Sequence, residues 1–270
     1  MRLCAAYKVF NGALYLPYSM KSIYNYVDRI IVFLSTVPWN GPEVPLDNTE
    51  EIVRNFPDPR KKISLVKGDF RYHKTPEDAY KNEFLQLNEM LSVVRSESPK
   101  NSHYLHVDAD EVYQPEHIQY LRTLLSTRPD VGSVSCAWRC YWKSFRYWID
   151  PIESSRPLIA FRIDAHTKFT GLRKVNMEPL VIPSEKELLI HHFSYAMTSD
   201  MVRAKIQAYS HCNEVRKDWF ENVWLAWDHH REMENLHPVW ACEYKKAVRA
   251  DESTLPKVMK THPFYGKEIF

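Results

Sequence analysis

The sequence predicts an α/β protein with a mainly parallel central sheet flanked by helices, followed by a helical C-terminal extension. The order of apolar segments along the first half of the chain supports the α/β class. Short apolar segments typical of strands alternate with segments of helical spacing through the first half of the chain. Such alternation is typical of parallel sheets that are covered by helices on both faces. We expect one main domain over residues 1–195, which contains the active site, and a helical extension over 196–270 packed on it.

Three strands are expected first, at residues 3–9, 29–35 and 63–66, where the chain is apolar. A helix within 14–26 follows the turn-forming Asn-Gly pair and connects the first two strands. Residues 37–59 hold five prolines and several polar side chains, which is typical of a long surface loop.

The next helix begins at Thr75-Pro76, because threonine can cap a helix and proline fits its first turn. Apolar residues at positions 80, 84, 87, 91 and 94 follow at helical spacing, so one face of this helix packs on the sheet. A strand over 103–107 then runs into Asp108, and another helix begins at Pro115.

The second half changes character. Two aromatic-rich segments, 131–142 and 158–163, have the composition of longer strands. From Ser199 onward the spacing of apolar residues is mostly helical.

Composition excludes several classes of protein. The 270 residues contain 36 Lys plus Arg and 34 Asp plus Glu, a formal net charge of +2, with no basic run, so we expect no nucleic-acid partner. The longest early apolar run, residues 30–34, is far too short to span a membrane, and the N-terminus lacks a signal-peptide pattern. We therefore expect a cytoplasmic protein without a transmembrane segment. Five cysteines without a CxxC pair are expected to be reduced thiols.

The most informative motif is the acidic cluster Asp108-Ala109-Asp110-Glu111, which directly follows an apolar strand. Ligands of parallel α/β sheets bind beyond the carboxyl ends of the strands, so the cluster is expected at the ligand-binding edge. Carboxylate oxygens are the ligands of Mg²⁺ and Mn²⁺, which commonly share their coordination with phosphate oxygens. The alternative is a solvated acidic turn before the Pro115 helix, where carboxylates favour the helix N-terminus.

With these residues, the chain resembles a glycosyltransferase of the GT-A fold, close to the family 2 type. Val27-Asp28 before the second strand, Lys81-Asn82 on the helix before the acidic strand, and the segment 105–111 carry the resemblance, in the family's order. A later stretch from Arg162 to Met177-Glu178 is similar to the family's arginine strand and His-Glu pair. The family's aspartate after the second strand, which holds the nucleobase, has no counterpart in the segment 33–36.

The resemblance implies the following roles. Asp110 binds a divalent metal, Mn²⁺ or Mg²⁺, and Asp108 contacts the metal or the donor's ribose. Tyr7 and Asn11 border the nucleotide, and Lys81 approaches the base or the phosphates. The implied reaction is of the hexosyltransferase type. A sugar moves from a nucleotide-diphosphate sugar, with UDP-sugar as the first choice, to a glycan or other hydroxyl acceptor with inversion.

Two histidines, His191-His192, follow an apolar run and offer a further metal ligand. Adjacent residues of a strand point to opposite faces, so only one of them can face the carboxylates. His192 resembles the late histidine of GT-A metal sites, and an imidazole ligand suits Mn²⁺ better than Mg²⁺. Structural roles for both histidines remain the alternative.

Inversion needs a carboxylate that accepts the proton of the acceptor hydroxyl. Glu178 is the first candidate, since it follows Gly171 in a segment expected to form a loop. Asp150 is the reserve. An exposed loop glutamate is the alternative interpretation of Glu178.

Two other functions compete with glycosyl transfer. A metal-dependent phosphohydrolase or nucleotidyltransferase could use the same carboxylates, although it would need more acidic residues for a second metal. A non-catalytic carbohydrate-binding protein could keep the fold. Asp228-His229-His230 resembles a phosphoesterase motif, but its late position in a segment of helical character argues against that function.

Overall fold

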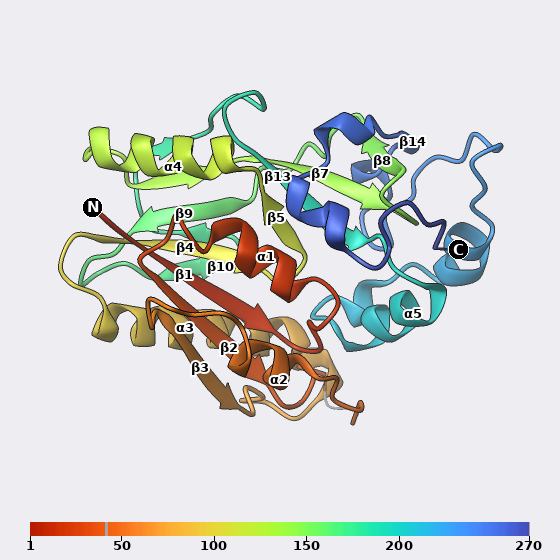
Figure 1. Cartoon of the computed structure of the whole chain (residues 1–270). Coiled ribbons are helices and arrows are strands. Elements are labelled where there is room, and N and C mark those ends of the chain that lie inside the picture. The colour runs from red at the N-terminus through yellow and green to blue at the C-terminus, as the bar shows by residue number, and fades with distance from the viewer. Residues whose placement is uncertain (41–42, 270) are drawn as a thin grey trace.

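The computed structural model describes residues 1–40 and 43–269 of the chain (Figure 1). Its larger sheet contains seven strands, in the spatial order β12-β6-β9-β4-β1-β2-β3. Their bounds are β1 Arg2–Val9, β2 Arg29–Ser35, β3 Ile63–Gly68, β4 Ser102–Asp108, β6 Ser133–Ser135, β9 Leu158–Arg162 and β12 Leu180–Val181. Strands β3, β2, β1 and β4 are parallel to one another, and β9 is antiparallel to both β4 and β6.

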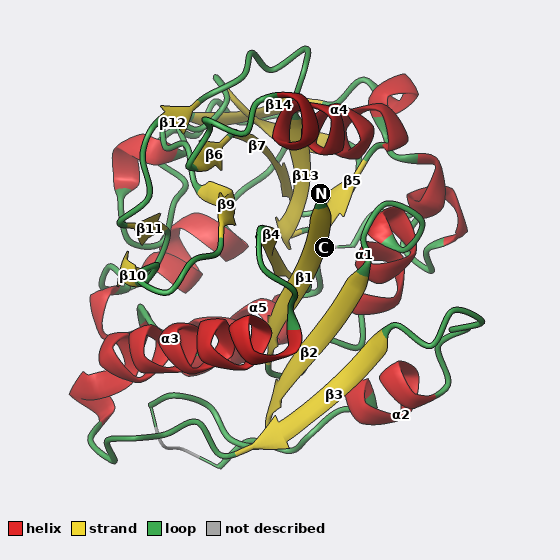
Figure 2. Cartoon of the chain, turned by 90° about the vertical axis from the view of Figure 1, so that its left-hand side faces the viewer, coloured by secondary structure: helices red, strands yellow, loops and turns green. Residues whose placement is uncertain are grey.

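Helices cover both faces of this sheet, as Figure 2 shows. They are α1 Leu16–Ile23, α2 Thr49–Arg54, α3 Ala79–Glu97 and α4 Pro115–Thr127, whereas α5 Ser199–Ala208 packs with the core of the second sheet. Alternate residues of β1 point to opposite faces: Leu3 and Ala5 pack with α1 and α4, whereas Cys4 and Ala6 pack with α3. The α/β class predicted from the sequence is confirmed.

A second sheet of five strands lies beside the first, in the order β14-β8-β7-β13-β5. Its strands are β5 Glu111–Tyr113, β7 Ala137–Trp142, β8 Tyr147–Asp150, β13 Leu189–Tyr195 and β14 Lys246–Arg249. β10 Phe169–Gly171 and β11 Lys174–Val175 form a separate two-stranded hairpin, and Phe169 packs on Tyr104 and Phe161 of the first sheet. Only a two-residue turn separates β4 from β5, so the chain passes from one sheet to the other at the acidic cluster.

Two predictions about the elements were wrong. The segment 37–59, predicted as a loop throughout, contains helix α2, because Thr49 to Arg54 lack the prolines of the flanking residues. The single strand expected over 131–142 is two strands: β6 pairs in the first sheet and β7 in the second. A switch between sheets leaves the apolar composition unchanged, and the sequence pattern therefore does not reveal it.

The C-terminal part is less helical than the spacing suggested. Besides α5, it contains a π-helix over Phe220–Leu225, 3-10 turns and strand β14, which pairs antiparallel with β8. A dense aromatic core joins it to the second sheet, where Trp142 packs on Trp219 and Trp224 with ring centroids 6.3 and 5.0 Å apart. Within the described residues, no helix is both long and apolar enough to cross a lipid bilayer.

Gly132, just before β6, lies against the backbone of the segment that leads into β12. A Cβ at this position would meet the carbonyl oxygen of Glu178 at 2.4 Å. We predict that Gly132→Ala lowers the free energy of unfolding by about 1–3 kcal/mol, as overpacking against backbone does. Urea titration followed by circular dichroism measures it. Gly68→Ala is the control, since its Cβ would meet only Phe70, at an ordinary 3.5 Å. Equal stability of the two variants would contradict the prediction.

Candidate functional site

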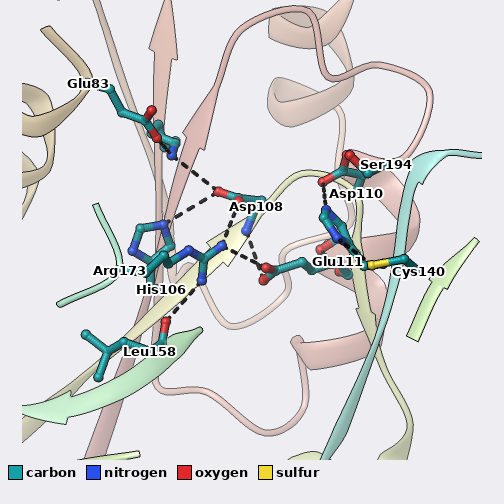
Figure 3. A network of polar contacts seen from close by, with 12 residues as sticks. Glu83, His106, Asp108, Asp110, Glu111, Cys140, Leu158, Arg173 and Ser194 are labelled. Atoms are coloured by element: carbon teal, nitrogen blue, oxygen red, sulfur yellow. Dashed lines mark hydrogen bonds and ion pairs between the residues drawn. The ribbon is translucent and has the colours of Figure 1, made fainter. Parts of the chain in front are cut away.

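The acidic cluster lies where the two sheets meet, at the carboxyl end of β4. On the β1 side, Lys8 is directly opposite Asp108. On the β5 side, His192 of β13 is directly opposite Glu111. The turn between Asp108 and Glu111 therefore brings together side chains from both sheets (Figure 3). This is the edge at which the sequence predicts ligand binding.

Arg173 lies between two of the three carboxylates. Its Nη2 donates to Asp108 Oδ2 at 2.6 Å and to Glu111 Oε1 at 2.8 Å, as Figure 3 shows. The other Glu111 oxygen accepts from the backbone N–H of Asp108 at 3.2 Å. Glu111 is fully buried, and a charge there is stable only with such partners. The cluster is therefore not a solvated acidic turn.

Asp108 has two further neighbours at its other oxygen. Lys8 Nζ lies 3.6 Å and His106 Nε2 3.5 Å from Asp108 Oδ1. Lys8 also pairs with Glu83 of α3. Since Oδ1 of Asp108 is buried and has no hydrogen-bond partner within the described residues, it is an acceptor available for a ligand or water.

Asp110 faces the second sheet. Its Oδ1 lies 3.5 Å from His192 Nε2, and its Oδ2 accepts from Lys205 Nζ at 2.9 Å. Lys205 belongs to α5 and also donates to the hydroxyl and the carbonyl of Ser194, at 2.7 and 3.0 Å. The predicted metal ligands Asp110 and His192 thus come together, while Asp108 is turned toward Arg173 and Lys8.

The charges of the cluster are set by burial and by these cations. Burial opposes ionisation of Asp110, but Lys205 and His192 outweigh it and hold the pKa of Asp110 well below its usual range. Burial likewise opposes charge on Asp108, whose pKa Arg173 and Lys8 nevertheless lower. For Glu111 burial prevails and raises the pKa to about 7, despite Arg173. At neutral pH the two aspartates are therefore ionised and available to a cation.

The donor atoms fit one divalent ion between Asp110 and His192. Two atoms 3.5 Å apart can both reach an ion at bonds of about 2.1 Å. The free oxygen of Asp108 can act through a water. Two protein ligands leave coordination positions for phosphate oxygens, the common arrangement for Mg²⁺ and Mn²⁺. The set of residues is therefore compatible with a metal shared between protein and diphosphate.

Within the described residues, a separate group of three potential ligands lies elsewhere on the chain. Ligand atoms of Asp228, His229 and His230 all lie within 4.8 Å of one another. These side chains are on the surface after the π-helix, and the Asp228 and His229 side chains are 47% and 40% exposed. Because the group lies outside the junction of the sheets, a substitution in it is a control for metal binding at the junction.

Three residues expected near a nucleotide have other surroundings. Tyr7 is fully buried and its hydroxyl contacts that of Ser19 at 3.0 Å, so its side chain has no surface for a ligand. Asn11, just past the end of β1, bonds to the loop at Pro45 and Asp47. Lys81 is exposed on α3 and lies 3.8 Å from Asp78.

Glu178 lies at the opposite end of the sheet from the cluster. In the β12–β6 pairing, Leu180 is opposite Ser133. Ser133 is in turn opposite Phe161 of β9, and Phe161 is opposite Tyr104, near the start of β4. Glu178 is therefore about 20 Å from Asp108 along the strand direction. The expected catalytic role of Glu178 does not fit this position; strand order, which the sequence does not reveal, is the reason.

Asp150 belongs to the second sheet, but its side chain lies on the face opposite to that of His192. It shares a face of β8 with Trp148, which packs edge-on against Tyr141 at 6.4 Å. The Tyr141 hydroxyl in turn contacts His191 Nδ1 at 2.9 Å. His192 points the other way, as predicted for adjacent residues of a strand. Asp150 is thus separated from the carboxylates by the sheet, and the reserve assignment of a base does not fit either.

The sequence did not point to the three basic residues of the site or to Trp39. Arg173 was not singled out, because it lies in the short β10–β11 hairpin with no motif around it. Lys205 lies in the segment that was assigned to the C-terminal extension. Lys8 could have been found, since it precedes the end of the first strand beside the acidic strand. Lys8 Nζ lies 5.4 Å from the centroid of the Trp39 ring. No motif in the sequence points to Trp39.

Removal of Arg173 tests how far the buried carboxylates depend on it. We predict that Arg173→Met lowers the free energy of unfolding by about 3–5 kcal/mol at pH 8, because it leaves buried charge uncompensated. Glu111 already has a raised pKa, and loss of Arg173 raises it further. Stability is therefore lost as pH rises through this pKa, and the deficit should shrink toward pH 5. Urea titrations at several pH values measure this dependence.

Arg128→Met is the matched control. Arg128 pairs with Asp130 on the surface, with side chains 55% and 56% exposed, and this pair should contribute about 0–1 kcal/mol. A pH-independent deficit for Arg173→Met, or one no larger than that of Arg128→Met, would show that the cluster does not need the guanidinium.

Comparison with known proteins gives one family. Residues 11–229 match the model of glycosyltransferase family 17, whereas the resemblance seen in the sequence pointed to family 2. No curated protein matches the chain. A crystal structure of mannose-6-phosphate isomerase from Helicobacter pylori is similar at 10% identity and a TM-score of 0.31, over 59% of this chain and 60% of that one. That likeness is too distant to support an argument. The family match covers most of the chain, including Asp108, Asp110, Arg173, His192 and Lys205, and the chain belongs to glycosyltransferase family 17.

Proposed function

We propose that this chain is a metal-dependent glycosyltransferase with a GT-A arrangement of its sheets. It would transfer a sugar from a nucleotide-diphosphate sugar to a hydroxyl acceptor with inversion. The observation that carries the proposal is the pairing of Asp110 with His192, 3.5 Å apart at the junction of the sheets. The family match supports glycosyl transfer; the metal, the donor and the stereochemistry are parts of the proposal.

The charges around the junction suit a diphosphate. Lys8, Arg173 and Lys205 approach from three separate elements, and each already contacts a carboxylate of the cluster. An incoming diphosphate can share these cations with the carboxylates, because each ammonium or guanidinium has several N–H donors. Preorganised cations stabilise charge that develops on a leaving group without a proton transfer.

Mn²⁺ is the proposed metal, held by Asp110 and His192, with Asp108 acting through water. The imidazole in the donor set favours Mn²⁺ over Mg²⁺. When bound, the ion would supply Lewis-acid neutralisation of the departing diphosphate. Arg173 would keep Asp108 and Glu111 in place meanwhile, and Lys205 would hold the second oxygen of Asp110.

The nucleobase would pack against Trp39, with uridine as the first base to test. Trp39 follows β2, the strand after which the resemblance locates base recognition. Its indole N–H donates to Gln86 at 2.7 Å and its carbonyl accepts from Asn82, so the ring is fixed from α3. Its contact with Lys8 connects it to the side of the cluster where the phosphates would lie.

The competing functions make different demands. A phosphohydrolase or nucleotidyltransferase with two metals needs more unpaired carboxylates than the junction offers, where Arg173 and Lys205 already engage all three. A non-catalytic carbohydrate-binding protein would bind a sugar nucleotide without turnover. Release of UDP from a UDP-sugar in the presence of an acceptor glycan distinguishes the enzyme from this last possibility.

The first experiment measures stabilisation by UDP with and without Mn²⁺. A ligand at a hundred times its Kd stabilises the folded state by about 2.7 kcal/mol. We expect UDP to raise the melting temperature of the wild type only with the metal present, and we expect no such increase in Asp110→Asn. Asp228→Asn, in the surface group of ligands, is the control and should retain it. A full shift in Asp110→Asn would rule out the proposed donor site.

A second experiment tests the nucleobase contact. We predict that Trp39→Ala weakens binding of UDP about tenfold or more, since stacking of a base on an aromatic ring contributes about 1–3 kcal/mol. Isothermal titration calorimetry in the presence of Mn²⁺ gives the Kd. Trp240→Ala is the matched control, because Trp240 is 48% exposed in the C-terminal part. If the two variants bind UDP equally well, the base does not pack on Trp39.

A further inference from the structure

His192 has a second ring nitrogen, which faces away from Asp110. This Nδ1 lies 3.6 Å from the sulfur of Cys140, and the two residues are direct partners in the pairing of β13 with β7. Both are buried, with 7% and 1% of their surfaces exposed. Figure 3 shows Cys140 beside the ring that faces Asp110. Cys140 is thus the immediate neighbour of the proposed metal ligand on its far side.

The contact chain continues to a carboxylate that has no assigned role. The thiol of Cys140 donates to Glu153 Oε2 at 3.4 Å, and the Ser155 hydroxyl donates to Glu153 Oε1. Glu153 is only 7% exposed. In the part of the chain that the structure describes, no Lys or Arg side chain forms an ion pair with this carboxylate. A buried carboxylate without a cation is costly, so Glu153 depends on its hydrogen bonds to Cys140 and Ser155.

We propose that Cys140 and Glu153 form the outer shell of the metal site and position His192. This inference rests on the proposed function. Neutral imidazole carries one proton, on either nitrogen. With Glu153 accepting from the thiol, the sulfur's lone pair accepts from Nδ1–H of His192. With Nε2 given to the ion, the one remaining proton would be on Nδ1 and would be donated to the sulfur. Outer-shell partners commonly fix the tautomer and orientation of a ligating histidine in this way.

The competing explanation is packing alone, since buried cysteines behave as small apolar residues. Cys136 provides the comparison within the same chain. It is fully buried four residues earlier and belongs to the core cluster of the first sheet, which does not include Cys140. If thiols serve only to fill space here, Cys136→Ala and Cys140→Ala should behave alike.

The test measures Mn²⁺ affinity without nucleotide, from the electron paramagnetic resonance signal of the free ion. All proteins carry Asp228→Asn to remove the surface group of ligands. Cys140→Ala and Glu153→Gln should weaken Mn²⁺ binding tenfold to a hundredfold. Cys136→Ala should stay within about twofold of the parent. Cys140→Ser keeps a donor and acceptor atom and should retain more affinity than Cys140→Ala; circular dichroism checks the fold of each.

A second, metal-free measurement separates this inference from the metal site itself. Long-range ¹H–¹⁵N correlation spectra report on Nδ1 of His192, and its resonance should shift in Cys140→Ala, which removes the sulfur 3.6 Å away, but not in Cys136→Ala. Unchanged Mn²⁺ affinity and an unchanged His192 spectrum in Cys140→Ala and Glu153→Gln would overturn the outer shell. If Asp110→Asn abolishes Mn²⁺ binding in that case, the metal site stands and only the inference fails. If the parent does not bind Mn²⁺, both fail.

Discussion

Three carboxylates within one four-residue segment have to be buried at the junction of two sheets, and the site depends on how their charge is compensated. Arg173 contributes most, since it bonds to Asp108 and to the fully buried Glu111. It comes from the β10–β11 hairpin, some sixty residues along the chain. Lys205 comes from α5 and Lys8 from β1. The compensation therefore fixes the hairpin, the C-terminal helix and the first strand around the acidic turn.

This arrangement makes the C-terminal part a component of the site. Helix α5 contributes Lys205, and strand β14 extends the second sheet through β8. The matched family region, residues 11–229, likewise runs across the expected boundary at 195. The aromatic core around Trp142 explains why the parts stay together, because it joins the second sheet to the segment after α5. A boundary at residue 195 follows the change in the sequence pattern, but residues beyond it contribute side chains to the site.

Successive side chains of β13 lie in two different environments, one on each face of the second sheet. His192 faces Asp110 and Cys140, whereas His191 contacts Tyr141 and Gln114 on the other face, beside a cavity of ≈ 180 Å³. Burial lowers the pKa of His191 to about 3, while Asp110 outweighs burial and raises the pKa of His192. Two adjacent, chemically identical residues therefore have pKa values shifted in opposite directions. Strand periodicity alone predicts that they differ, but not which of them faces the carboxylates.

The sequence by itself determined the α/β class, the strand that ends at Asp108 and the candidate pair Asp110 and His192. Apolar periodicity and the position of polar residues at strand ends are local properties, and a single sequence carries them. Tertiary structure alone decided the rest. Glu178 lies at the wrong end of the sheet and Asp150 on the wrong face, because strand order and the switch between β6 and β7 are not local. Arg173, Lys205 and Glu153 reach the site across long stretches of chain. Only the packing of the two sheets brings such side chains together, and no spacing within the sequence records it.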